Sequence, residues 1–193
     1  MKILFLTNNP KVSDVLYTWL TDSGEDVLYE TKPVNDEYII NNAIEFIISY
    51  NYLHIIRQEV IDLLPHRIIN LHISFLPYNR GASPNIWSFI NCTPCGVTIH
   101  EVDAGVDTGD ILLQQQITFD IYNETLSSTY EKLHNTIQNL FYDNWDMIKR
   151  QRIIPYKQPD GGTVHKRVEL QRYEQILRYD EIIAEFLNKV KGQ

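Results

Sequence analysis

Short apolar runs that alternate with helical patterns constrain the fold of this chain more than any other feature. Residues 3–7 form an apolar run bounded by Asn-Asn-Pro, which is typical of a strand buried on both faces. The same alternation continues along the first half of the sequence, with strands expected at residues 26–31, 43–50 and 67–70 and helices at 11–22, 37–42 and 58–64. Strands joined through helices are parallel, with right-handed crossovers. The pattern therefore predicts an α/β fold with a doubly wound, Rossmann-like, mostly parallel sheet.

The pattern changes after residue 95. Residues 96–102 and 111–118 are β-rich and are joined by the Asp- and Gly-rich loop 103–110. Two such segments with a short connection predict an antiparallel strand pair added to the parallel sheet. Apolar side chains then recur on one stripe over residues 124–150, which predicts a long helix.

The remaining residues are expected to form a short helical tail. A turn signal lies at residues 160–163, and apolar side chains at helical spacing predict one amphipathic helix around residues 173–187. We assign residues 1–150 to one catalytic domain and residues 151–193 to a C-terminal tail that is not an independent domain, because the sequence between them contains no long linker.

Charge and hydropathy exclude several classes of partner. The chain has 17 Lys and Arg against 25 Asp and Glu, a formal net charge of −8, and no basic cluster, so nucleic acid is not expected as a partner. The first apolar run is too short for a secretion signal or a membrane span, so no membrane association is expected. Two cysteines cannot form a disulfide framework. The sequence is most simply cytoplasmic.

Cys92 and Cys95 form a Cys-x-x-Cys pair with Thr93 and Pro94 inside it. A zinc site would need two further ligands, and neither a second such pair nor a close pair of histidines supplies them. A redox pair is expected to open a helix, whereas β-favouring residues follow here. We therefore interpret the segment as a loop that enters a strand and expect no metal site.

Three polar residues stand where a parallel sheet would bind a ligand. Asn70 and His72 lie at the end of the fourth strand, and Asp107 lies in the loop of the antiparallel pair. An amide can donate to an oxyanion, an imidazole can accept a proton, and a carboxylate can orient the imidazole, which together suit acyl transfer. Whether His72 acts as base or, protonated, as electrostatic stabiliser stays open. A lone Asn or His at a strand end is more often structural, but three together favour catalysis.

The segments around these residues resemble the folate-dependent formyltransferases. That family has Asn-x-His followed by Ser-x-Leu-Pro, and later a His and an Asp-x-Gly segment. The matching residues are NLHISFLP at 70–77, GVTIH at 96–100 and VDTG at 106–109. The resemblance implies Asn70, His72 and Asp107 as catalytic residues and N10-formyltetrahydrofolate as the formyl donor.

The resemblance also implies where the folate binds. In this family the pterin lies between the loop after the third strand and the Asp-bearing loop, which correspond to residues 52–56 and 103–107. Main-chain groups of one loop and apolar walls would hold the flat ring. The folate-binding residues expected on this basis are Leu53, His54, Ile55, Ile56, His100, Asp103 and Gly105. His100 is equally well explained as a hydrogen-bonded strand histidine.

Departures from the family pattern narrow the range of acceptor substrates that the chain is expected to use. Glycinamide ribonucleotide enzymes carry a Gly- and Ser-rich phosphate loop after the first strand, whereas residues 7–11 contain no glycine. Methionyl-tRNA enzymes add a basic C-terminal β-barrel domain that binds tRNA, whereas this chain is acidic as a whole and has only about forty residues after its long helix, so a tRNA acceptor is not expected. A folate hydrolase adds an N-terminal regulatory domain that the sequence does not match.

The segments YNRGASPNIW at 78–87 and GGTVH at 161–165 resemble the sugar N-formyltransferases, which act on a deoxyamino sugar linked to a nucleotide diphosphate (dTDP or UDP). The substrate-binding residues expected on this basis are Tyr78, Asn79, Arg80, Asn85 and Trp87. Trp87 and Arg80 have structural explanations too, as a core residue of a short helix and a solvated turn charge. The alternatives are a small amine such as glycinamide ribonucleotide or an amino acid, and a non-catalytic nucleotide- or folate-binding module.

Self-association is also expected. The helix 124–150 and the tail around 173–187 carry more apolar residues than one sheet edge should cover, and exposed apolar surface of that kind favours symmetric dimers. Related sugar formyltransferases are typically homodimers. The alternative is that the tail folds back over the long helix within one subunit.

Overall fold

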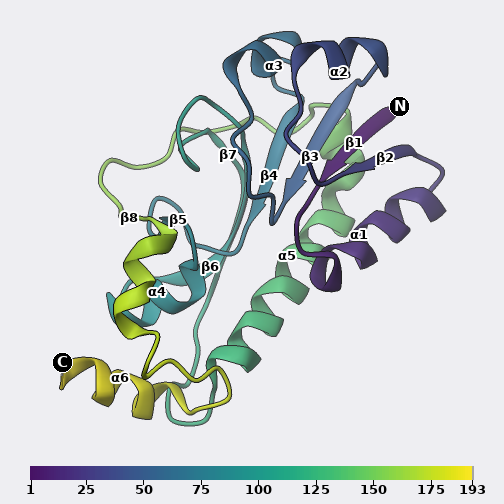
Figure 1. The fold of residues 1–193 in the computed structure, drawn as a ribbon. Coiled ribbons are helices and arrows are strands. Elements are labelled where there is room, and N and C mark those ends of the chain that lie inside the picture. The colour runs from purple at the N-terminus through teal and green to yellow at the C-terminus, as the bar shows by residue number, and fades with distance from the viewer. Residues whose placement is uncertain (193) are drawn as a thin grey trace.

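The computed structural model describes residues 1–192 and contains a six-stranded mixed sheet with helices on both faces (Figure 1). Its strands are β1 (Lys2–Leu6), β2 (Asp26–Glu30), β3 (Phe46–Tyr50), β4 (Ile68–His72), β6 (Cys95–Glu101) and β7 (Ile111–Ile117). The order across the sheet is β2-β1-β3-β4-β6-β7. The first four strands are parallel, whereas β6 runs antiparallel to both β4 and β7. The predicted doubly wound sheet with an added antiparallel pair is confirmed.

Two layers of helices bury the two faces of the sheet. The helices are α1 (Pro10–Asp22), α2 (Asp36–Asn41), α3 (Gln58–Leu63), α4 (Pro84–Ile90), α5 (Leu126–Lys149), α6 (Ile183–Lys191) and the 3-10 helix η1 (Arg167–Tyr173). Successive side chains of β1 point to opposite faces, so Ile3 and Phe5 pack against α1 and α5, while Leu4 and Leu6 pack against α2 and α3. Burial on both faces explains why the strand sequences are continuously apolar.

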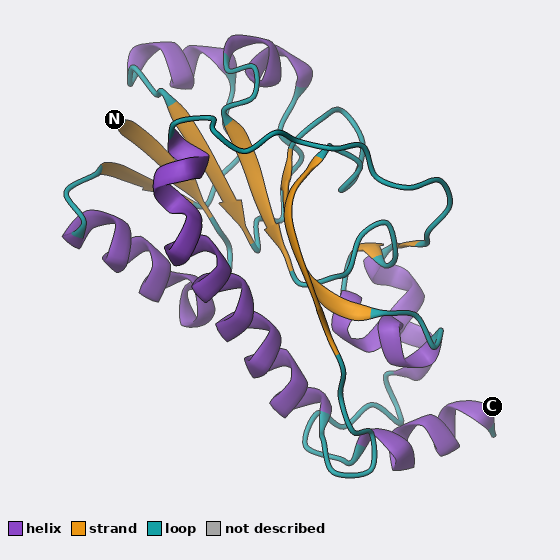
Figure 2. Ribbon diagram, turned by 180° about the vertical axis from the view of Figure 1, so that it is seen from behind, coloured by secondary structure: helices purple, strands orange, loops and turns teal. Residues whose placement is uncertain are grey.

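Helix α5 crosses the sheet along one face (Figure 2). It begins with a capping box in which Thr125 accepts from the backbone N–H of Ser128 and the Ser128 hydroxyl accepts from the backbone N–H of Thr125. Its apolar stripe includes Leu133, Ile137 and Phe141, each at most 1% exposed. The predicted long helix is confirmed.

The tail differs from the single helix predicted around residues 173–187. Helix η1 ends at Tyr173 and α6 begins only at Ile183. Backbone groups between these two helices are hydrogen-bonded to the start of α5 instead: the Ser127 N–H donates to the Tyr179 carbonyl, and the Ile183 N–H donates to the Glu124 carbonyl. A continuous helix would need those groups for itself, so contacts with the start of α5 override the helical pattern.

The tail packs onto the rest of the chain at two places. Phe186 and Ile183 of α6 are fully buried against Ile86, Phe89 and Leu126, which belong to α4 and α5. Upstream, β8 (Val164–His165) pairs in parallel with β5 (Arg80–Gly81) to form a second, two-stranded sheet. These contacts bring the tail close to the segment that follows β4.

The Cys-x-x-Cys segment lies where the sequence predicts it. Cys95 is the first residue of β6, and Cys92 is exposed in the preceding loop; both are free thiols. Within residues 1–192, no three or more His, Cys, Asp or Glu side chains are grouped so as to hold a metal ion. Over the same residues, no helix is both long and apolar enough to span a membrane.

Candidate active site

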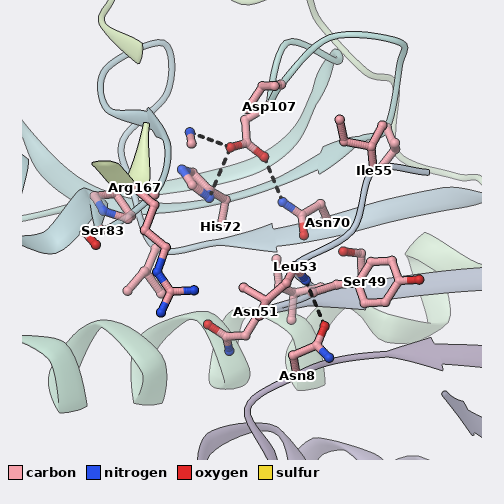
Figure 3. A pocket seen from close by; sticks show the side chains of 18 of the residues that line it. Asn8, Ser49, Asn51, Leu53, Ile55, Asn70, His72, Ser83, Asp107 and Arg167 are labelled. Carbon is pink, nitrogen blue, oxygen red and sulfur yellow. Dashed lines mark hydrogen bonds and ion pairs between the residues drawn. The ribbon is translucent and has the colours of Figure 1, made fainter. Parts of the chain in front are cut away.

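A cavity of about 770 Å³ opens at the edge of the sheet where β1, β3 and β4 end (Figure 3). Asn8, Asn51 and His72 contribute to its wall from or just after these strands, and the loop 103–107 contributes from the other side. Parallel strands leave diverging loops at their carboxyl ends, which is where open α/β sheets bind ligands. The cavity is therefore at the edge that the sequence predicts.

Asn70, His72 and Asp107 come together in this cavity. Asn70 and His72 are two residues apart on β4, so both side chains leave the same face of the sheet. The Asn70 Nδ2 donates to Asp107 Oδ1 at 3.0 Å, and His72 Nδ1 lies 3.7 Å from Asp107 Oδ2. His100 joins them because β6 pairs it directly opposite Asn70.

Asp107 is held as a buried carboxylate. Its Oδ2 accepts a hydrogen bond of 2.8 Å from the Gly81 backbone N–H, and its Oδ1 lies 3.4 Å from His100 Nε2. Burial by itself would raise the pKa of the Asp107 carboxyl, but His72, His100 and the Gly81 amide outweigh it and hold this pKa well below its usual range. Asp107 is therefore ionised across the physiological pH range.

The hydrogen bonds of His72 identify its tautomer. His72 Nε2 lies 3.2 Å from the backbone carbonyl of Asn79, and a carbonyl can only accept, so Nε2 carries the proton. Burial lowers the pKa of His72 below its ordinary value, although the charge of Asp107 opposes this. The side chain is thus neutral near pH 7, and the unprotonated Nδ1 faces Asp107.

Both hydrogens of the Asn70 amide are already engaged. One is donated to Asp107 Oδ1, and the other points to His100 Nε2 at 3.2 Å. His100 Nδ1 lies 2.7 Å from the Glu101 carbonyl and so donates its proton there, which leaves Nε2 to accept. His100 is 2% exposed. It is both a hydrogen-bonded strand histidine and part of the cavity wall.

The two loops expected to flank the folate both line this cavity. Leu53 and Ile55 are 67% and 77% exposed, so apolar side chains face an open space without a partner. The Asn8 side chain fixes this loop by accepting from the Leu53 N–H at 2.9 Å. In the opposite loop, Asp103 accepts from the Thr108 hydroxyl and so closes a local turn. The other residues expected at the folate, His54, Ile56 and Gly105, are also in the wall.

Most of the residues expected to bind the acceptor lie outside the cavity wall, unlike those expected to bind the folate. Only Asn85 is in the cavity wall, and its amide is used internally, donating to the Leu126 carbonyl and accepting from the Thr129 hydroxyl. Trp87 is 1% exposed and stacks on His165 with the ring centres 4.0 Å apart.

Asn79, Arg80 and Tyr78 are likewise outside the wall. The Asn79 side chain is buried and donates to the Thr93 hydroxyl at 2.8 Å, while its carbonyl holds His72. Arg80 donates to the Gln158 side chain, and Tyr78 lies in the same turn, where its carbonyl accepts from the Ser74 hydroxyl. These contacts give all three residues a supporting role around the cavity.

A family model described as formyl transferase matches residues 25–144, which include Asn70, His72 and Asp107. The chain belongs to the formyl transferase family. The matched region contains the strands β3, β4, β6 and β7 and most of α5, and hence most of the cavity wall.

Known formyl transferases resemble the chain over different lengths. A formyltransferase from Anoxybacillus kamchatkensis, solved in complex with UDP-4,6-dideoxy-4-formamido-L-AltNAc and tetrahydrofolate, is 39% identical, with a TM-score of 0.88 and 97% of each chain covered. The methionyl-tRNA formyltransferase of Thermodesulfovibrio yellowstonii is 34% identical over 77% of this chain but only 47% of its own length. The chain thus spans about half the length of the curated relatives it matches. A Shewanella sugar N-formyltransferase, 22% identical, shares the fold with a TM-score of 0.76, covering 94% of this chain and 82% of its own.

Sequence reasoning missed several wall residues of this formyl transferase. Asn51 directly follows β3, and Ser83 directly precedes α4. Both adopt left-handed backbone conformations, with φ of 56° and 57°. Ser83-Pro84 is a helix-start signal that could have located α4. Tyr179 and Arg167 come from the tail, and Figure 3 shows the Arg167 side chain extending into the cavity. The segment 161–165 resembles the sugar N-formyltransferases, but no local signal links Arg167 or Tyr179 to this site.

Proposed function

We propose that this chain is a sugar N-formyltransferase that moves a formyl group from N10-formyltetrahydrofolate to the amino group of a UDP-linked deoxyamino sugar. The observation that carries the proposal is the similarity to the Anoxybacillus kamchatkensis enzyme, which extends over 97% of both chains. Two curated methionyl-tRNA formyltransferases, in contrast, are matched over only 47% and 44% of their own length. A full-length match to a sugar enzyme outweighs a partial match to a tRNA enzyme.

The cavity fits a folate. Exposed Leu53 and Ile55 offer apolar contact on one side, and the loop 103–107 offers main-chain groups on the other, as a flat ring with polar edges requires. The folate supplies a formyl group on nitrogen, which is an acyl donor for amines. We therefore assign the folate to the space between these two loops.

His72 is suited to act as the base. The acceptor amine must lose a proton when it attacks the formyl carbon, and His72 offers an unprotonated Nδ1 in a neutral ring. When the bond between the formyl carbon and N10 of the folate breaks, the leaving nitrogen takes up one proton, which the His72 imidazolium can return. The Asp107 carboxylate lies 3.7 Å from that nitrogen and stabilises the imidazolium that proton transfer creates. Of the two roles that the sequence leaves open for His72, the geometry supports the base.

Asn70 is suited to donate to the oxyanion after an exchange of partners. Both of its amide hydrogens are engaged, so one must leave its present acceptor. The contact to His100 is longer than that to Asp107, 3.2 against 3.0 Å, and Asp107 carries the stronger attraction as a charged acceptor. We therefore expect the hydrogen now directed at His100 to turn to the oxyanion.

Arg167 supports a diphosphate-linked acceptor. It is the one Lys or Arg in the cavity wall within residues 1–192, and its side chain makes no hydrogen bond or ion pair with those residues. Arg80, which the sequence predicts as a substrate-binding residue, instead donates two hydrogen bonds to the side chain of Gln158. A guanidinium fork matches phosphate oxygens in geometry and charge. We assign Arg167 to the diphosphate.

Thermal-shift measurements distinguish the candidate acceptors. UDP-4-amino-4,6-dideoxy sugars are expected to raise the melting temperature, and Arg167→Met is expected to abolish this rise while a folate analogue still stabilises the variant. Lys157→Met, an exposed tail residue with the same charge change, is the control. A rise with glycinamide ribonucleotide or an amino acid alone would favour the small-amine alternative. Stabilisation by folate and nucleotide without any transfer would favour the binding module.

We also predict that the protein is a homodimer, that it is cytoplasmic, and that its catalytic domain ends at residue 150. Packing of α6 on α4 and α5 already covers part of the apolar surface that motivated the dimer. Exposed Val15 and Met147 nevertheless remain on the outer sides of α1 and α5. Light scattering at micromolar concentration tests the dimer, and the mass of one chain would contradict it.

A further inference from the structure

The side chain of Gln158, a residue of the tail, is hydrogen-bonded to the backbone of the loop that carries Asp107. The side-chain Nε2 of Gln158 donates to the carbonyl of Asp107 and to the carbonyl of Gly109, both at 2.8 Å. Asp107 itself has φ of 52°, a left-handed conformation that is unfavourable for a non-glycine residue. Contacts beyond the loop are needed to hold such a residue in place.

Arg80 fixes the orientation of Gln158. Its Nε and Nη2 donate to Gln158 Oε1 at 3.1 and 2.7 Å. An arginine can only donate and a backbone carbonyl can only accept, so the amide of Gln158 has one possible orientation. All four hydrogen bonds of the side chain are therefore mutually consistent, and Gln158 links Arg80 rigidly to the Asp107 loop.

The tail also reaches the carboxylate of Asp107 by a second route. Strand β8 pairs with β5, where Gly81 donates its backbone N–H to Asp107 Oδ2 at 2.8 Å. Gly81 has φ of 85°, and a Cβ at this position would lie 2.4 Å from the His165 carbonyl oxygen. Only glycine fits this close approach. Residues 155–165 thus support both the backbone and the side chain of Asp107.

We propose that Gln158 is a positioning residue for the formyl transfer reaction, acting through Asp107, and that Arg80 acts through Gln158. This rests on the proposed function, because Asp107 is assigned there to stabilise the His72 imidazolium. The clamp formed by Arg80 and Gln158 sets where the carboxylate stands relative to His72 Nδ1. The tail is then part of the catalytic machinery, even though its residues do not touch the reacting atoms.

Hydrogen exchange tests the clamp without any substrate. Gln158→Met keeps the length of the side chain but removes its four hydrogen bonds, and it is expected to speed exchange of the amides in residues 103–110. Gln171→Met, at an exposed tail position, should leave that exchange unchanged. Equal exchange in Gln158→Met and the unchanged protein would overturn the proposal. This result does not depend on the acceptor, so it stands apart from a failure of the proposed function.

Kinetics test the consequence for catalysis. Gln158→Met is expected to lower kcat about tenfold to a hundredfold, with KM for the acceptor changed less than about twofold, since a small displacement of a catalytic group costs rate rather than binding. Because Asp107 raises the pKa of His72, its displacement should also move the acid limb of the kcat profile to lower pH. A loss of folded protein alone would not move that limb. An unchanged kcat and limb would overturn the proposal.

A double variant tests the role of Arg80. If Arg80 acts through Gln158, Arg80→Met lowers kcat in the unchanged protein but changes it less than about twofold in the Gln158→Met background. If Arg80 instead contacts the acceptor, Arg80→Met raises the acceptor KM in both backgrounds. The second result would overturn this part of the proposal and return Arg80 to the substrate site.

Discussion

Replacement of Asp107 by Asn tests the electrostatics of the site most sharply. The side chain is 14% exposed and accepts from the Gly81 N–H and from Asn70 Nδ2 at 2.8 and 3.0 Å. An Asn has one oxygen, so whichever way its amide turns, its NH₂ faces one of these two donors. One hydrogen bond to a charged group is lost, which corresponds to about 1.5–3 kcal/mol of unfolding free energy.

The same variant has a defined pH signature. The folded-state pKa of Asp107 is depressed, so the carboxylate stabilises the fold fully above its unfolded pKa of about 3.9 and loses this contribution as the pH falls toward the folded value. Because Asp107 also raises the pKa of His72, the difference in unfolding free energy between the protein and Asp107→Asn should widen as the pH falls below about 6.5, the unfolded pKa of histidine, and should shrink below about pH 4 as the unfolded carboxyl takes up a proton. Turnover should fall at least about a hundredfold, because the variant cannot stabilise the His72 imidazolium.

Urea unfolding at a series of pH values, with kcat measured on the same preparations, provides the assay. A stability difference that keeps growing below about pH 4 would contradict this expectation, because it would mean that Asp107 is protonated in the folded state. Near-normal turnover at neutral pH would remove Asp107 from the mechanism.

Three further predictions concern the partners of Asp107 in the site, the loops that flank the folate, and the tail. Asn70→Ala and His72→Ala should each lower turnover at least about a hundredfold with the fold intact, and the double variant should lose much less than the product; multiplicative losses would argue against one catalytic unit. A folate analogue should slow amide exchange in residues 52–56 and 103–107, and unchanged exchange in both would mean that the pterin binds elsewhere. Phe186→Ala, at a fully buried site, should lower the unfolding free energy by about 3–5 kcal/mol in chemical denaturation, and a loss below about 1 kcal/mol would mean that the tail is loosely packed.

The sheet and its edge were predictable because they depend on local patterns. Ile3 and Leu4 are both apolar since β1 is buried on both faces, and this signal survives without knowledge of the neighbouring strands. Asn70 and His72 were predictable as site residues because they end such a strand, and the carboxyl end of a parallel strand is where ligands bind.

The acceptor side of the cavity was not predictable in the same way. Arg167 and Gln158 reach the site from the tail, and their roles depend on the pairing of β8 with β5, which two-residue strands do not signal. Arg80 and Trp87 look like binding residues in isolation. Their partners, Gln158 and His165, are distant in the sequence, and only the fold reveals that these side chains are occupied.

Transfer of the formyl group to an amino sugar is the most direct test of the proposed function. The protein would be incubated with N10-formyltetrahydrofolate and a UDP-4-amino-4,6-dideoxy sugar, and the sugar product and released tetrahydrofolate would be followed by mass spectrometry and absorbance. We expect a UDP-formamido sugar formed one-for-one with tetrahydrofolate, and almost none with His72→Ala. Transfer to methionyl-tRNA or glycinamide ribonucleotide in place of any UDP- or dTDP-linked amino sugar would contradict it.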